Sequence, residues 1–328
     1  MMANTTIERT DDADARSGQT PGSLSLLARP LALTGRAVLL ATDGSPCAVA
    51  AARVAYGLTR RCRANVHVLS VVDTRSAPMP PPVDLAIAMG DAIGGSELHR
   101  QQERSVRAEL SGALDESIEW PVRIRLGTPA TAIVQEAQHL GAALIVVGLR
   151  RHGRLDRAVH DETALNVMRA AACPVLGVVA DATDLPRRIL AAVDFSQGSL
   201  IALAAGRAVA GEGATFVLAY VKPMSGFLTD EGQARIHDMG VKAGFASLAQ
   251  EMAEVGVSFD HVVLHNASPQ TPGEALLEYA DEVGSDLITA GSVQHSRLDR
   301  WMVGSVSAEL VRNGRRSVLV VPPPRRAG

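Results

Sequence analysis

The sequence predicts an α/β protein made of two copies of one doubly wound, parallel-sheet domain. An internal repeat is the first reason: shifted by 143 positions, residues 128–180 fall on residues 271–323 without a gap. The most specific shared element is the tetrad RLDR at 154–157, which recurs at 297–300. The second reason is that apolar strand-like runs alternate with helical stretches in both halves. Any two unrelated αβ segments share some Val, Ile and Gly residues. They do not share residues of such different chemical types at one constant offset.

The elements of the first half follow one another in a regular order. Strands are expected at 38–42, 66–72, 122–126, 142–148 and 173–179. Helices are expected at 46–61 and 96–117; a third helix is expected to begin at 129, and a fourth to end at 171. Pro129 suits the first turn of its helix. The second half repeats this order up to 317–322. Five strands separated by helices require right-handed crossovers, so each half is predicted to hold a five-stranded, doubly wound parallel sheet.

The predicted domains are residues 35–181 and 186–323, joined by a short connection at 180–186. Residues 1–34 are polar and interrupted by Pro and Gly, which predicts a disordered tail. Residues 73–95 are too rich in Pro and Gly for a regular element and are expected to form a mobile loop.

Composition narrows the functional classes. Hydrophobic residues make up 47% and aromatic residues 3%, so the cores are expected to consist of aliphatic side chains. A net charge of −3 gives no general attraction to nucleic acid or to anionic membranes, and no apolar run is long enough to cross a bilayer. The cysteines Cys47, Cys62 and Cys173 have neither metal-ligand nor redox spacing. A soluble, cytoplasmic protein without nucleic-acid or membrane partners is expected.

Three features resemble the universal stress protein family in its tandem form, over nearly all of residues 36–322. Each first strand ends in an aspartate and a small turn, TDGSP with Asp43 and VDFSQ with Asp194. Each fourth strand ends in a glycine, Gly148 or Gly291. The second half continues GSVQHSRLDRWMVGSVSAELV and closes with SVLVVP. The resemblance implies a fold like that of the adenine nucleotide α-hydrolases, with the two halves paired about a pseudo-twofold axis, and a site for ATP or a related adenine nucleotide, with Mg²⁺ accompanying it.

The second half keeps most of the family's nucleotide-binding pattern. The positions that the resemblance assigns to the ligand are Asp194, Tyr220, Gly291, Gln294, Gly304, Ser305, Val306 and Ser307. Gln294 replaces the middle glycine of the phosphate loop, and Tyr220 replaces a valine on the adenine side. A helix that begins at Gly304-Ser305 would present backbone N–H groups and a positive dipole end to a phosphate.

The first half keeps only part of this pattern, namely Asp43, Val71 and Gly148. The middle glycine is Arg151, and the pair Asp161-Glu162 replaces Gly-Ser. Two carboxylates at a helix N-terminus would themselves satisfy its dipole and repel a triphosphate. We therefore predict that the first half has lost standard ATP binding. The arginines of GLRRHGRLDR (148–157) could bind another anion or pair with the two acids.

Simpler structural roles compete with these assignments. Asp43 and Asp194 could serve only the turn before a helix, Ser305 could be only an N-cap, and His152 and His295 have the pattern of surface residues rather than metal ligands.

Three functions remain open. The leading hypothesis is a stress-response protein that binds an adenine nucleotide in its second half as a conformational switch. The alternatives are an interaction scaffold without nucleotide and a slow ATPase, although no GxxxxGK[ST] motif is present. Family members dimerise through the last strand, so pairing of 175–179 with 318–322 within one chain, a homodimer of tandem chains and an unidentified protein partner are further expectations.

Overall fold

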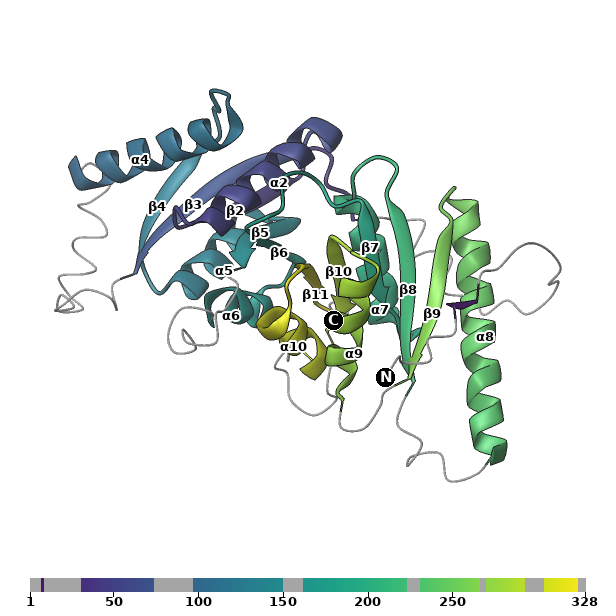
Figure 1. Cartoon of the computed structure of the whole chain (residues 1–328). Coiled ribbons are helices and arrows are strands. Elements are labelled where there is room, and N and C mark those ends of the chain that lie inside the picture. The colour runs from purple at the N-terminus through teal and green to yellow at the C-terminus, as the bar shows by residue number, and fades with distance from the viewer. Residues whose placement is uncertain are drawn as a thin grey trace. The chain divides into compact units, whose positions relative to one another are not determined.

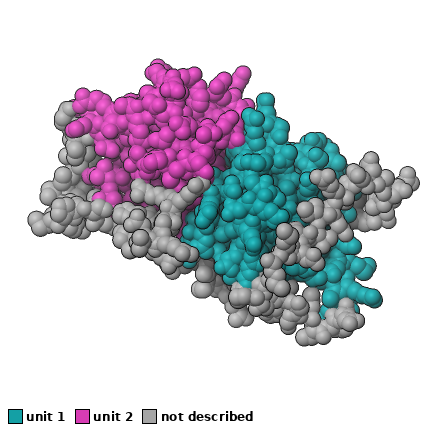
Figure 2. All heavy atoms as spheres, viewed as in Figure 1, with its two compact units in different colours: residues 1–31, 186–328 teal, residues 32–185 magenta. Residues whose placement is uncertain are grey.

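The structure, a computed structural model, describes residues 7–8, 31–73, 97–149, 162–222, 231–265, 270–292 and 304–323. The chain divides into two compact units, residues 32–185 and residues 186–328 together with 1–31 (Figure 2). Nearly all of the Pro-rich loop predicted at 73–95, the arginine-rich loop after Leu149, and Gln294 lie outside the described residues.

The unit of residues 32–185 is a parallel α/β sheet (Figure 1). Its described elements are β2 (Ala37–Thr42), α2 (Pro46–Cys62), β3 (Asn65–Asp73), α4 (Glu97–Leu114), β4 (Val122–Gly127), α5 (Pro129–Leu140), β5 (Leu144–Leu149), α6 (Glu162–Ala170) and β6 (Val175–Val179). The strand order is β6-β5-β2-β3-β4, and every neighbouring pair is parallel. This confirms the predicted fold class.

The second unit repeats this plan. Its elements are β7 (Arg188–Ala192), α7 (Gln197–Val209), β8 (Thr215–Lys222), α8 (Glu231–Glu254), β9 (Phe259–His265), α9 (Pro272–Glu282), β10 (Leu287–Gly291), α10 (Ser305–Asn313) and β11 (Ser317–Val321). The order β11-β10-β7-β8-β9 is again parallel throughout. The first residues of α6 and α10, Glu162 and Ser305, are the pair that the sequence repeat aligns.

Two described parts of the predicted tail contact the folded domains. A two-residue strand, β1 (Ile7–Glu8), pairs antiparallel with β9, and the side chain of Leu33 is 3% exposed. These described positions have a strand pairing and a buried side chain, while the disorder expected for residues 1–34 as a whole stays a prediction.

The cores are aliphatic, as the composition indicates. Leu39 and Leu40 of β2 and Leu144 and Ile145 of β5 are fully buried. Each such side chain contributes about 1.5–3 kcal/mol relative to an exposed one. The buried face of α2 is mostly alanine, which lets this helix approach the sheet closely. The result is a dense core with few aromatic rings.

The first helix of each unit begins in the same way. Ser45 is the N-cap of α2, where its hydroxyl accepts a hydrogen bond from Ala48 N at 3.3 Å. Ser196 caps α7 through Ser199 N, also at 3.3 Å. These caps fix the start of each helix directly after the first strand, which is where the candidate site lies.

A buried carboxylate is the main polar feature of the first core. Glu136 of α5 is 1% exposed, and its oxygens lie 2.9 Å from Arg123 Nη1 and 2.6 Å from Arg125 Nη2, both on β4. We expect Arg123→Ala to lower the free energy of unfolding by about 1 kcal/mol, because Arg125 still compensates the buried charge. Chemical denaturation followed by circular dichroism would measure this. A cost as large as that of removing both arginines would contradict the shared pairing.

Candidate functional site

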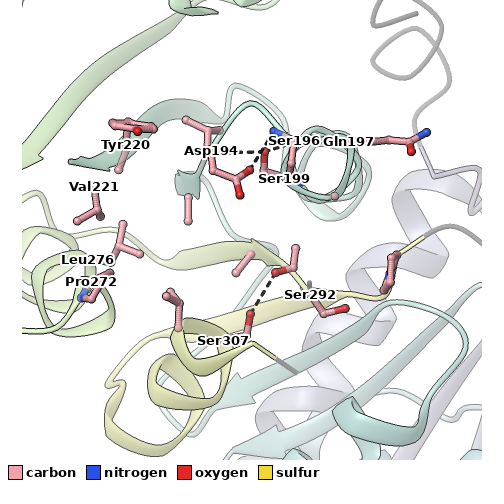
Figure 3. A pocket seen from close by; sticks show the side chains of 18 residues that line it. Asp194, Ser196, Gln197, Ser199, Tyr220, Val221, Pro272, Leu276, Ser292 and Ser307 are labelled. Atoms are coloured by element: carbon pink, nitrogen blue, oxygen red, sulfur yellow. Dashed lines mark hydrogen bonds between the residues drawn. The ribbon is translucent and has the colours of Figure 1, made fainter. Parts of the chain in front are cut away.

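A cavity of about 600 Å³ opens at the carboxyl ends of β7 and β10, two adjacent strands whose chain connections run in opposite directions along the sheet. Parallel α/β sheets bind their ligands at such switch points. The described lining residues come from β7, the β7–α7 turn, α7, β8, α9, β10 and α10, with Ser292 beyond β10 and Pro323 beyond β11. They are Ala192, Val193, Asp194, Ser196, Gln197, Gly198, Ser199, Ala219, Tyr220, Val221, Pro272, Leu276, Ala290, Gly291, Ser292, Val306, Ser307 and Pro323. Figure 3 shows Asp194 and Ser199 on one wall, Ser292 and Ser307 on the opposite wall, and Tyr220 and Val221 together at one end.

The structure brings together most of the residues that the sequence assigned to this site. Asp194, Tyr220, Gly291, Val306 and Ser307 all line the cavity. The preceding pair at the start of α10, Gly304-Ser305, is not part of the lining. Ser305 is the first residue inside the helix and not its cap, because the N-cap is Gly304.

Asp194 organises the turn between β7 and α7. Its Oδ1 accepts a hydrogen bond from Ser196 N at 3.0 Å, and its own N–H donates to Ser199 Oγ at 3.3 Å. Burial opposes ionisation, but hydrogen bonds from Ser196 and Ser199 outweigh it and lower the pKa of Asp194. This carboxylate therefore stabilises the fold above the ordinary carboxyl pKa, and the contribution is lost as the pH falls through the lowered value. The structural role expected for Asp194 is thus present, and the side chain also faces the cavity.

Glycine at the end of β10 is explained by packing. A Cβ on Gly291 would lie 2.6 Å from both the carbonyl carbon and the oxygen of Gly198 and 3.0 Å from Ser199 N. In the other unit, a Cβ on Gly148 would lie 2.8 Å from the carbonyl carbon of Cys47 and 2.9 Å from Ala48 N. In both units the first helix therefore starts directly against the fourth strand. The resemblance assigned these glycines to the phosphate, but close helix–strand contact is sufficient reason for them.

The N-terminus of α10 forms one wall of the cavity, and among the described residues no side chain caps it. Gly304 offers no acceptor, and the first turn contains no acid. The Ser307 hydroxyl donates to Gly291 O at 3.3 Å, which ties the helix start to the end of β10. By contrast, α9 is capped by its own residues, since Thr271 and Glu274 form a reciprocal capping box. The first-turn amides of α10 thus point a positive dipole end at the cavity.

Among the described residues that line the cavity, Asp194 carries the only charged side chain. Within this described part of the lining, any attraction to an anion comes from backbone N–H groups and from the α7 and α10 dipoles. The first turn of α7 also lacks an acid, and its residues Gln197 and Gly198 lie in the wall.

Aromatic residues gather behind the Tyr220 end of the cavity. The Tyr220 ring stacks on Phe195 with centroids 5.6 Å apart, and Phe195 meets Phe245 of α8 edge-on at 5.2 Å. The Tyr220 hydroxyl lies 3.0 Å from His237 Nε2. Burial, followed by the negative charges of Asp194 and Asp238, raises the pKa of Tyr220. The phenol of Tyr220 therefore stays neutral. Phe195 contacts its ring, and His237 contacts its hydroxyl.

Phe195 adopts a backbone conformation that is unusual for a bulky residue. Its φ is 60°, whereas the first unit has Gly44, with φ 76°, in the matching turn. We expect Phe195→Gly to destabilise the second unit less than Phe195→Ala, by about 1 kcal/mol, because both variants lose the ring contacts but only glycine relieves the strain. Urea unfolding of both variants checks this; equal costs would mean that no strain is relieved.

The equivalent edge of the first unit is more acidic. Asp43 Oδ1 accepts from Ser45 N at 3.0 Å, which repeats the Asp194 turn. Val71 and Gly148 lie near the carboxyl ends of β3 and β5, matching Tyr220 and Gly291 in the second unit. The additional group is Glu109 of α4, whose Oε1 accepts from Thr42 Oγ1 at 3.4 Å. Burial and the charge of Asp43 raise the pKa of Glu109.

The sequence patterns did not identify several of these residues. Ser196 and Ser199 had a visible signal, because Ser-x-x-Ser after a strand is typical of a helix start. Ser292 directly follows the predicted Gly291. Glu109 and Leu276 had no local signal, because they lie on helices that only the fold brings to these sheet edges. Phe195 lies next to Asp194 in the chain, but its ring contacts with Tyr220 and Phe245 had no local signal either.

Comparison with known proteins places the chain in a family. The sequence model of the universal stress protein family matches residues 35–178 and again 186–322. A universal stress protein of Methanocaldococcus jannaschii is 31% identical over 145 residues, covering 43% of this chain and 80% of that protein.

Solved structures show the same fold over both halves. A universal stress protein from Archaeoglobus fulgidus superposes with a TM-score of 0.61 at 18% identity, covering 88% of this chain and 98% of that one. A protein of unknown function from Pseudomonas aeruginosa gives a TM-score of 0.56 at 18% identity, covering 88% and 92%. With two family matches in sequence and the same α/β plan in both units, the chain belongs to the universal stress protein family and carries two of its domains in tandem.

Proposed function

We propose that the second domain binds ATP or a related adenine nucleotide in the cavity between α7 and α10, with Mg²⁺ carried by the phosphates, and that the chain acts as a nucleotide-responsive stress protein. The first domain, in this proposal, does not seat a triphosphate. The observation that carries the proposal is the α10 N-terminus, which forms a cavity wall without a side-chain cap and without an acid in its first turn.

The shape and polarity of the cavity support this ligand class. Its volume of about 600 Å³ lies within the range of small-molecule sites. Tyr220, Val221 and Leu276 supply an apolar end that suits a planar base, and the two helix starts supply the polar end that suits phosphate. The Tyr220 ring can stack on a base at its face, while its hydroxyl stays with His237.

The asymmetry between the domains is electrostatic. The first domain begins α6 with Glu162, where the second begins α10 with Ser305. It also places Glu109 beside the Asp43 turn. Glu109 opposes a triphosphate at the same edge of the sheet where the second domain offers backbone amides.

Calorimetric titration of the full chain with ATP, ADP and adenosine tests the proposal, together with mass spectrometry for co-purified nucleotide. The expected result is one nucleotide per chain, bound more tightly as phosphates are added. Absence of binding at millimolar nucleotide would reject this function and leave the interaction scaffold as the better reading.

A further inference from the structure

A short strand near the N-terminus pairs with the outer edge of the second-domain sheet. β9 pairs along its inner side with β8, from Phe216↔Phe259 to Lys222↔His265. On its outer side it pairs antiparallel with β1, through Ile7↔Val262 and Glu8↔His261 (Figure 1, the short purple strand beside β9). Within the part of the chain that the structure describes, β1 covers two of the seven β9 residues.

The matching edge of the first domain is protected by charge instead. No described residue pairs with the outer side of β4, but β4 carries Arg123 and Arg125, which are half-exposed and held by Glu136. Long charged side chains on an edge strand discourage pairing with another chain. β9, with the sequence FDHVVLH, contains no Lys or Arg, and Asp260 is its single carboxylate. The β9 edge therefore needs another form of protection.

The antiparallel direction in which β1 pairs with β9 is also open to a second copy of the chain. Two copies of β9 related by a twofold axis would pair antiparallel, which is the direction that β1 takes. If Val262 of one copy pairs with Val262 of the other, Phe259 faces His265 and Asp260 faces Leu264. No like charges then oppose each other across the interface.

We propose that Ile7–Glu8 is an intramolecular edge cover that competes with β9 of a second copy of this chain for the outer edge of β9. Withdrawal of this strand exposes backbone N–H and C=O groups of β9, and a second copy satisfies them by continuing the sheet across a twofold interface. This inference does not depend on nucleotide binding.

The test uses the full chain with Ile7→Pro and Glu8→Pro. Consecutive strand residues point their N–H groups to opposite sides, so replacing both removes whichever donor faces β9. Amide exchange at residues 261–262 should become roughly tenfold faster at low protein concentration. The dimer fraction from sedimentation velocity should rise several-fold as the protein is concentrated. The matched control, Ile7→Thr with Glu8→Gln, keeps both N–H groups and should leave exchange and association unchanged.

A synthetic peptide spanning residues 3–12, added to the proline variant, should restore slow exchange and reduce the dimer. Unchanged exchange in the proline variant would overturn the proposal. Faster exchange without concentration-dependent dimer would overturn it as well, because β1 would then cover an edge that no second copy takes. Thermal unfolding of each variant verifies that the domains remain folded.

Discussion

Gly304→Asp combined with Ser305→Glu is expected to weaken ATP binding on the order of 100-fold. The substitution copies the acidic pair Asp161-Glu162 of the first domain into the start of α10. An aspartate at the N-cap would accept hydrogen bonds from the first-turn amides, and both carboxylates would repel the phosphates. Titration calorimetry of the full chain measures the change.

The matched control is Gly304→Asn with Ser305→Gln. These side chains have nearly the same size, and asparagine caps a helix as well as aspartate does, but neither carries charge. Retention of most of the affinity in the control would assign the loss to charge. If the acidic variant bound ATP as the parent chain does, α10 would not be the phosphate seat.

Gly291→Ala is expected to lower the stability of the second domain by about 3 kcal/mol, the upper end of the cost of overpacking. The new Cβ would overlap backbone atoms of Gly198, and backbone cannot move aside as the tip of a side chain can. Because the start of α7 is one wall of the cavity, ATP affinity should fall in the same variant. Urea unfolding and titration calorimetry report the two effects.

Two other glycines serve as controls for that substitution. A Cβ on Gly240 of α8 would have no heavy atom within 4 Å, so Gly240→Ala should stabilise its helix by about 0.5–1 kcal/mol. Gly148→Ala makes the same kind of backbone clash in the first domain and should destabilise that domain without changing ATP affinity. A Gly291→Ala protein as stable as the parent would contradict the packing explanation.

The fold could be predicted from the sequence because its determinants are local or repeated. Apolar runs marked the ten parallel strands of the two domains, and the constant offset aligned Glu162 with Ser305, which the structure places at the first residues of α6 and α10. The pairing of β1 with β9 had no such determinant. Two residues within a polar segment carry no periodic signal, and their partner lies near the other end of the chain.

The sequence predicted which residues lie at the site, but not the contacts that explain why those residues are there. The sequence identifies Gly291 as the last residue of a strand, but its contact with Gly198 exists only because α7 packs on β10. Phe195 was read as part of a turn. Its ring contacts with Tyr220 and Phe245 depend on three elements meeting in space. Glu109 lies on a helix of ordinary appearance, and only the fold brings it to Thr42.

Hydrogen exchange of the full chain with and without ATP tests the central asymmetry most directly, because it reads both domains in one experiment. The cavity in the second domain predicts slower exchange with ATP at 194–199, 290–292 and 304–308, and no change at 42–48 and 145–149. Protection confined to the first-domain segments would contradict the account, since a triphosphate would then have bound beside Asp43 and Glu109 in preference to the amides of α10.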